Sequence, residues 1–157
     1  MTESFPRQHA RTQRFTLGEP RNIAVSPDGA RVVFLRSSAG DDPGNSLWVM
    51  DRETGEERLV ADPAQLLGEP NDDLPPEERA RRERSREAAG GITGFATDVA
   101  VRVTGFAVGG RLFVAGLLSG RARPLDVEGP VVDPRPDPLA TRLAYVSGRA
   151  LRTVSYT

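Results

Sequence analysis

Short apolar runs, separated by turn-forming residues, recur along this chain from residue 21 to residue 154. Most runs are about five residues long and alternate apolar with polar side chains, which is the period of a half-buried β-strand. None approaches the roughly 18 residues that a membrane-spanning helix needs. The pattern therefore restricts the chain to an all-β fold of short strands joined by tight connections.

The first group of runs predicts a four-stranded antiparallel meander from Arg21 to Val60. Its runs are Ile23–Val25, Val33–Leu35, Leu47–Val49 and Leu59–Val60. The turn Ser26-Pro27-Asp28-Gly29 separates the first two runs. Proline presets φ for a turn, and Asp-Gly tolerates the positive φ of a tight hairpin.

The next segment interrupts the strand pattern. Residues 62–73 are loop-like, and Pro75-Pro76-Glu77-Glu78 has the composition of a helix start. We expect a charged helix over residues 75–89, ended by Gly90-Gly91. It has almost no apolar stripe, and its interleaved glutamates cancel much of the field of its arginines. We therefore interpret it as a solvated insertion rather than a nucleic-acid patch.

Two further groups of runs follow the insertion. The second predicts four strands, from Ile92–Ala96, Val99–Val103, Leu112–Val114 and Arg121–Leu125. Gly109-Gly110 predicts a two-residue hairpin within it. The third predicts three strands, from Val131-Val132, Leu143–Val146 and Leu151–Val154.

The third group repeats the first. Residues 26–35 align with residues 137–146 at an offset of 111 positions, and a proline, an arginine and an aliphatic-aromatic pair coincide. Repeated four-stranded meanders are typical of β-propeller blades, and a coincidental meander in a β-sandwich is the alternative. Leu139-Ala140 replaces the Asp-Gly of the first turn, and these residues do not favour a positive φ.

We therefore predict an all-β partial β-propeller of two and a half to three four-stranded antiparallel blades with a short charged helical insertion. Residues 1–16 form an N-terminal arm, and residues 17–157 form the partial propeller. Within it we place a blade at 17–67, the helical insertion at 68–90, a blade at 91–126 and an incomplete blade at 129–157.

The composition excludes several kinds of catalytic site. The sequence has no cysteine and a single histidine, His9, so thiolate and multi-histidine metal sites cannot form. All 21 basic residues are arginine, which excludes a Schiff-base lysine and a P-loop lysine. We expect no metal and no cofactor.

The formal net charge of −1 gives no reason to expect nucleic-acid binding. The polar start has no apolar signal region, so we expect a cytoplasmic protein without membrane contact.

Several segments resemble the N-terminal propeller region of bacterial dipeptidyl peptidase IV-like serine peptidases, in the prolyl oligopeptidase family. The Ser26–Gly29 turn with Leu47–Asp51 and Thr54-Gly55-Glu56 resembles the propeller repeat of that family, which TolB-type propellers share. More specific are the following matches: residues 6–18, the loop Gly40–Pro43, the segment Leu74–Arg79, the strand Gly110–Val114 and the segment Pro130–Arg135. Together they extend over most of the chain, from Pro6 to Arg152.

The resemblance implies a propeller that gates peptide substrates for a C-terminal α/β-hydrolase domain, which holds the Ser-Asp-His triad in such peptidases. No Gly-x-Ser-x-Gly elbow occurs here, so we expect no peptidase activity from this chain alone. The family uses an early propeller arginine to hold a substrate carbonyl. Arg121 and Arg123 are the candidates for that role, and solvated hairpin arginines are the alternative.

Two further expectations concern partners. A stand-alone TolB-like propeller that binds proteins, without enzymatic activity, is the alternative function. An incomplete propeller also leaves strand edges open, and open edges invite pairing with another chain. We therefore expect a homodimer, or poor solubility, through the strands near residues 141–156.

Overall fold

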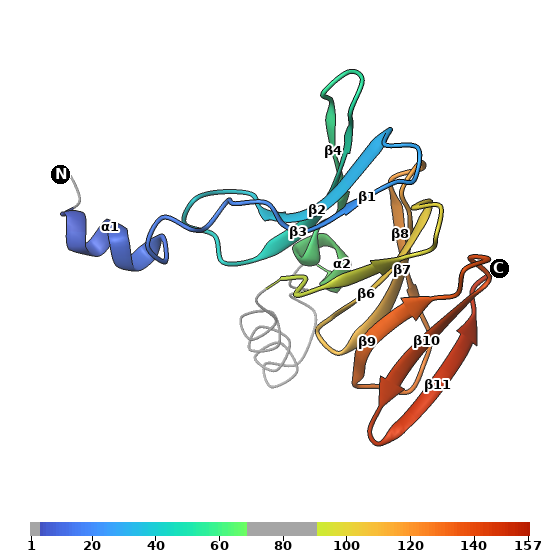
Figure 1. The fold of residues 1–157 in the computed structure, drawn as a ribbon. Helices are drawn as coiled ribbons and strands as arrows, with labels where there is room; N and C mark the ends of the chain where they lie inside the picture. Colours follow the sequence, from blue (N-terminus) through green and yellow to red (C-terminus); the bar gives the residue numbers. More distant parts are fainter. Residues whose placement is uncertain (1–3, 69–90) are drawn as a thin grey trace.

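A computed structural model describes residues 4–68 and 91–157, which form three antiparallel sheets side by side (Figure 1). The first sheet has the order β1 (Arg21–Val25), β2 (Arg31–Ser37), β3 (Asn45–Asp51), β4 (Glu57–Ala61). The second has the order β5 (Phe95–Thr97), β6 (Val103–Val108), β7 (Arg111–Gly116), β8 (Arg121–Leu125). The third has the order β9 (Val131–Pro136), β10 (Arg142–Ser147), β11 (Ala150–Ser155).

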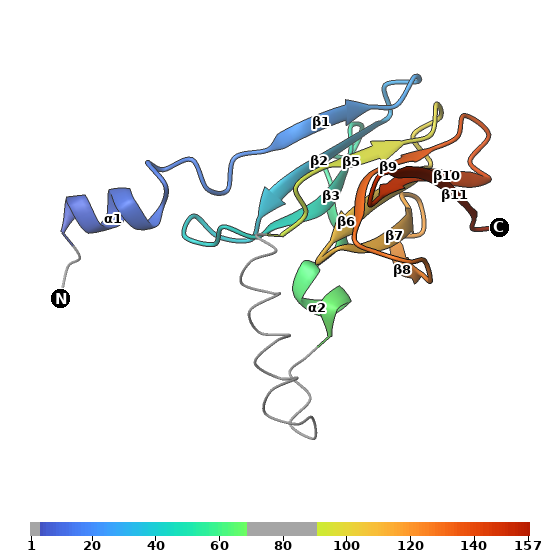
Figure 2. The same cartoon turned by 90° about the horizontal axis from the view of Figure 1, so that it is seen from below.

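The three sheets are blades of a partial β-propeller, and the predicted fold class is confirmed. Each pairs strands that are consecutive in sequence, as blades do. The hairpin at Gly109-Gly110 is also confirmed, since Val108 pairs with Arg111 across two glycines of positive φ. Figure 2 shows the three sheets from below, with α1 (Phe5–Arg11) extending away from them. We call the sheets the first, second and third blade.

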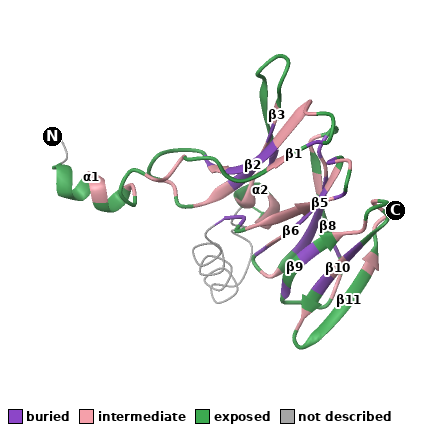
Figure 3. Cartoon of the chain, viewed as in Figure 1, coloured by how far each residue is buried: buried purple, intermediate pink, exposed green. Residues whose placement is uncertain are grey.

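The second blade is buried on both faces. In β7, Phe113 and Ala115 pack toward the first blade, whereas Leu112 and Val114 pack toward the third. Alternate strand residues point to opposite faces, so this strand shows four consecutive buried residues. Buried residues therefore concentrate in the middle of the stack (Figure 3).

Gly105 allows the second and third blades to approach closely. A Cβ atom at this position would lie 2.4 Å from Cδ2 of Leu143, which is fully buried in β10. The Leu143 side chain of the third blade thus occupies the space that a side chain at position 105 of the second blade would fill.

The connection between the first two strands has the same six-residue geometry in all three blades. Its first residue is Ser26, Asp98 or Asp137, and the backbone N–H of that residue donates to the carbonyl of the sixth. The side chain of the first residue accepts a hydrogen bond from the backbone N–H of the sixth, at 2.9 Å in each blade. We call this connection the blade turn.

The fourth residue of each blade turn has a positive φ: 68° at Gly29, 52° at Val101 and 57° at Ala140. The third blade therefore keeps the turn of the first although Ala140 replaces the glycine. In the second blade the predicted strand Val99–Val103 is wrong over its first four residues. They belong to the blade turn, and β6 begins at Val103.

Two arginines on the outermost strands link neighbouring blades. Arg58 in β4 donates to the carbonyls of Leu117 and Leu118, both at 2.7 Å. Arg123 in β8 donates to the carbonyl of Tyr156 in the same way. The two arginines are equivalent, because they pair with Val49 and Val114 at matching positions of their blades. We call them the inter-blade arginines.

A close backbone contact returns the chain from the insertion to the first blade. Gly91 forms a parallel bridge with Asn45, and the Ile92 N–H donates to the Asn45 carbonyl at 2.8 Å. A Cβ atom at position 91 would lie 2.1 Å from the Asn45 nitrogen. Gly91 also has a φ of 83°, so only glycine fits there.

Two short helices lie outside the sheets. In α1, the His9 ring lies 5.7 Å from Phe5 and 5.8 Å from Phe15. The second helix, α2 (Pro63–Leu67), falls where a loop was predicted. Asp62 caps it by accepting from the Ala64 N–H at 2.9 Å, and Pro63 occupies its first turn. The predicted helix at 75–89 lies outside the described residues.

The Gly105 contact predicts the effect of an added methyl group. Gly105→Ala should destabilise the chain by about 1–3 kcal/mol, because the new Cβ displaces the buried Leu143 side chain. Gly40→Ala is the matched control, since its Cβ would meet no atom within 4 Å. Urea unfolding measures both, and equal stability of the two variants would contradict the packing of these blades.

The inter-blade arginines predict a second difference. Arg123→Gln should lower the free energy of unfolding by about 1 kcal/mol, because it removes a charged donor to the Tyr156 carbonyl. Arg121→Gln, two residues earlier on the exposed end of the same strand, should change it by less than about 0.5 kcal/mol. Thermal unfolding compares them, and the reverse order would contradict this role.

The acids of three turns predict a pH dependence. Backbone hydrogen bonds from Arg142 and Thr141 hold the pKa of Asp137 below its ordinary value, and hydrogen bonds likewise lower the pKa of Asp28 and of Asp51. Because the folded-state pKa is lowered, this stabilisation is complete above about pH 4 and is lost as the pH falls below it. Asp137→Asn should make the fall of Tm between pH 5 and pH 2 shallower. An unchanged slope would contradict the account.

Candidate functional site

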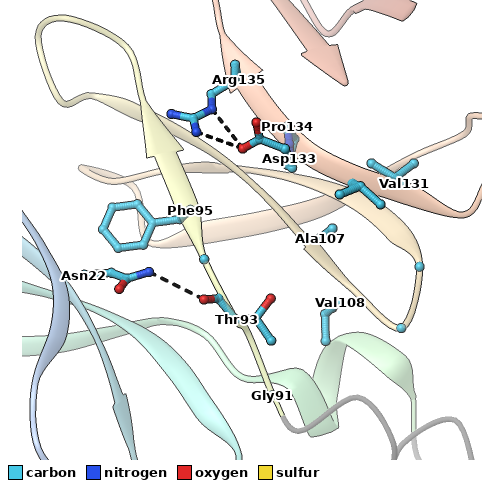
Figure 4. A pocket seen from close by; sticks show the side chains of 14 residues that line it. Asn22, Gly91, Thr93, Phe95, Ala107, Val108, Val131, Asp133, Pro134 and Arg135 are labelled. Atoms are coloured by element: carbon cyan, nitrogen blue, oxygen red, sulfur yellow. Dashed lines mark hydrogen bonds and ion pairs between the residues drawn. The ribbon is translucent and has the colours of Figure 1, made fainter. Parts of the chain in front are cut away.

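A pocket of about 680 Å³ lies where the first strands of all three blades come together (Figure 4). Asn22 of β1 lines one side and Phe95 of β5 another. The β6–β7 hairpin around Gly109 and the start of β9 complete the wall. In a propeller the first strand of each blade is the innermost, so the pocket occupies the channel side of the stack.

The polar part of the pocket is carried mainly by β9. Oδ1 of Asp133 accepts a hydrogen bond from Nε of Arg135 at 2.9 Å and forms an ion pair with Nη2 of the same arginine, also at 2.9 Å. Their side chains are 61% and 65% exposed, so this ion pair is solvated and weak, and both groups are accessible to a ligand. Across the pocket, Nδ2 of Asn22 donates to the Thr93 carbonyl at 3.5 Å.

The backbone of β9 is irregular at Asp133, two residues before Arg135. Asp133 has a φ of 49°, and the pairing of β9 with β10 shifts register between Ala144 and Val146. Such a bulge changes the direction of the side chains beside it. The neighbouring wall is apolar and consists of Phe95, Ala107, Val108 and Val131. The pocket thus combines this apolar wall with one anionic group, Asp133, and one cationic group, Arg135.

The predicted substrate-binding residues lie elsewhere. Arg121 and Arg123 are on β8, at the opposite edge of the second blade from β5, and neither lines the pocket. Arg123 is engaged with the Tyr156 carbonyl, and Arg121 is exposed at the start of its strand. Their assignment to substrate stays a prediction.

The sequence interpretation gave no role to Asp133 and Arg135. The signal available was the alternation Asp133-Pro134-Arg135 within a strand, which places both charges on one face. The only histidine, His9, lies in α1 and does not line the pocket. Within residues 4–68 and 91–157, no cluster of three His, Cys, Asp or Glu side chains is placed to hold a metal ion. Over the same residues, no helix has both the length and the apolarity to cross a membrane.

No family model matches the sequence, but the fold is similar to several solved structures. TolB from Acinetobacter baumannii has a TM-score of 0.54 and 10% identity over 88% of this chain and 30% of that one. The tricorn protease has a TM-score of 0.54 and 13% identity over 87% of this chain and 12% of that one. A complex of KlAtg21 with the coiled-coil of AgAtg16 has a TM-score of 0.54 and 12% identity, over 85% and 39%.

This chain therefore spans from 12% to 39% of the length of these three proteins. At such low identity the likeness concerns the fold alone. The proteins that share the fold include a protease and TolB, and the chain itself is a partial β-propeller of three stacked blades.

Proposed function

We propose that this chain is the non-catalytic propeller portion of a serine exopeptidase resembling dipeptidyl peptidase IV. It would gate and orient peptide substrates for an α/β-hydrolase domain outside this sequence. The observation that carries the proposal is the channel-side pocket, in which Asp133 and Arg135 stand exposed beside an apolar wall.

The pocket chemistry suits the start of a peptide chain. A peptide with a free amino terminus offers one ammonium group, followed by carbonyl oxygens and small or apolar side chains. Asp133 would accept hydrogen bonds from the ammonium group, and Arg135 would donate to a carbonyl. Phe95 and Val131 would contact the apolar side chains, and proline is a side chain of suitable size.

Hydrolysis itself is assigned to groups outside this chain. A Ser-His-Asp triad needs a histidine beside its serine, whereas His9 lies in α1 against Phe5 and Phe15. We expect the purified chain to leave an Ala-Pro chromogenic substrate intact. Turnover that scales with chain concentration across independent preparations would contradict this expectation.

Peptide binding tests the proposal directly. A peptide beginning Ala-Pro and labelled at its carboxyl end should bind, as measured by fluorescence anisotropy. Arg135→Gln should weaken binding about fivefold or more, because a charged donor is lost. Arg149→Gln, at an exposed arginine in the β10–β11 turn, is the matched control.

Acetylation of the peptide is the second arm of this experiment. Removing the charge of the amino terminus should weaken binding to the native chain but have little effect on Asp133→Asn, which has lost the partner carboxylate. Equal affinities for all peptides and variants, or no binding at millimolar peptide, would contradict the proposal.

A stand-alone TolB-like binding module is the second candidate, and the fold similarity to TolB favours it as much as the similarity to the tricorn protease favours the first. The gene sequence immediately downstream discriminates between them. A reading frame with further blades and a Gly-x-Ser-x-Gly motif supports the peptidase. An unrelated gene after a stop codon supports the module.

A further inference from the structure

The innermost strands of the first and third blades have the same β-bulge. In β1 the pairing shifts register around Asn22, and in β9 it shifts around Asp133. Both residues have a positive φ, of 51° and 49°. In each strand, two residues lie opposite a single aromatic residue of the neighbouring strand, which is Phe34 in the first blade and Tyr145 in the third. The bulge is therefore a repeated feature of the blade.

Asn22 and Asp133 are equivalent residues, because each stands four positions before the first residue of its blade turn. Gly94 stands at that position in the second blade. We call it the bulge position. Its three residues all line the pocket, so each blade presents this position to the same space. Asparagine and aspartate tolerate a positive φ better than most residues, and the bulge can therefore carry a polar side chain into the pocket.

Gly94 keeps the middle of the pocket open. Its φ lies outside the left-handed region, so the backbone does not require glycine there. A Cβ atom at position 94 would meet one described atom within 4 Å, Nδ2 of Asn22 at 3.7 Å. In Figure 4, the Phe95 side chain stands between Asn22 and the pair formed by Asp133 and Arg135. The route from the first blade to the third thus passes Phe95, and no side chain from position 94 blocks it.

Asn22 supplies a neutral acceptor at the first-blade side of the pocket. Its Nδ2 donates to the Thr93 carbonyl at 3.5 Å, which orients the amide toward the second blade. Its Oδ1 accepts no hydrogen bond from a described residue, and the residue is exposed. An uncharged amide oxygen suits a neutral donor such as a backbone N–H, whereas an ammonium group is held better by the carboxylate of Asp133.

The separation of the blades sets the length of a ligand that reaches both residues. Packed sheets lie about 10 Å apart, so two steps from the third blade to the first span at most about 20 Å. An extended peptide advances about 3.3 Å per residue and covers that span with about six residues. The blades converge toward the channel, which shortens the span. The pocket volume of about 680 Å³ falls within the range of sites that enclose an organic ligand.

We propose that the pocket holds an extended peptide across the innermost strands of all three blades, and that Asn22 accepts a hydrogen bond from a backbone N–H between the fourth and sixth residues of that peptide. The inference rests on the proposed function, in which the amino terminus lies at Asp133. In a peptidase that releases dipeptides, Asn22 would hold the part of the substrate beyond the scissile bond. The substrate class is therefore an unstructured peptide of at least about five residues.

A length series of peptides tests the inference on the purified chain. Amidated peptides that begin Ala-Pro and continue with alanine, from three to eight residues long, are titrated by calorimetry. The hexapeptide should bind the native chain about three- to tenfold more tightly than the tripeptide, which is the contribution of one neutral hydrogen bond. Extension from six to eight residues should add nothing, because the chain has then passed Asn22.

Removal of the Asn22 side chain should abolish this gain. Asn22→Gly keeps a residue that accepts the positive φ, and the affinity ratio of hexapeptide to tripeptide should fall to about one. Ala140→Gly is the matched control, since Ala140 also has a positive φ, of 57°, and lies outside the pocket. It should keep the native ratio. Circular dichroism checks that both variants fold.

Methylation of single peptide nitrogens identifies the donor. An N-methyl group at the fourth, fifth or sixth residue removes one N–H, and one of these three peptides should lose the gain on the native chain. The same peptide should lose nothing further on Asn22→Gly, because the two changes remove one hydrogen bond. A purely structural role of Asn22 would not produce this coupling.

A side chain at position 94 supplies a second, independent variant. Gly94→Leu should also lose the gain from length, because its side chain would stand in the route between Asn22 and Asp133. Gly40→Leu is its matched control, since a Cβ atom there meets nothing within 4 Å and the residue lies outside the pocket. Gly40→Leu should keep the native ratio.

The outcomes separate this inference from the proposed function. Tripeptide and hexapeptide that bind equally well to the native chain would overturn the inference and leave the proposed function standing. A gain from length that persists in Asn22→Gly, or that no single N-methyl group removes, would also overturn it. Absence of binding by every peptide would overturn the proposed function and this inference together.

Discussion

The structure depends on the burial of the second blade between its two neighbours. Phe106 and Phe113 stack at 5.7 Å on the side of the first blade, and Leu112 lies against the third. All three side chains are fully removed from solvent, and burial of each contributes about 1.5–3 kcal/mol. A four-stranded sheet with two apolar faces is not stable in water by itself. The neighbouring blades therefore supply what the second blade needs.

The blade turn sets the register in which these faces meet. The side chain of Ser26, Asp98 or Asp137 satisfies a backbone donor at the start of the second strand and so fixes where that strand begins. One position in the strand then meets the preceding blade in the second and third blades, where Phe106 and Tyr145 occupy it. The inter-blade arginines add a polar link at the outer edge, where backbone carbonyls of the next blade face them.

Local patterns in the sequence predicted the strands and the propeller class, because alternation and glycine turns act over a few residues. The hairpin at Gly109-Gly110 and the repeat of residues 26–35 at 137–146 are examples. The second blade turn was missed because Val99, Val101 and Val103 alternate like a strand, although Asp98 carried the signal of a turn. The pocket could not be predicted, since it assembles Asn22, Phe95 and Asp133 from three blades. That assembly depends on stacking, which no local pattern encodes.

Amide hydrogen exchange on the native chain tests the central claim most directly. The claim is that the second blade is stabilised from both sides, whereas the described residues of other blades cover the third blade on one side only. It predicts that the amides of β6 and β7 exchange slowest, at the rate of global unfolding, and that those of β11 exchange much faster. Protection in β11 equal to that in β7, or uniform protection across all three blades, would contradict it.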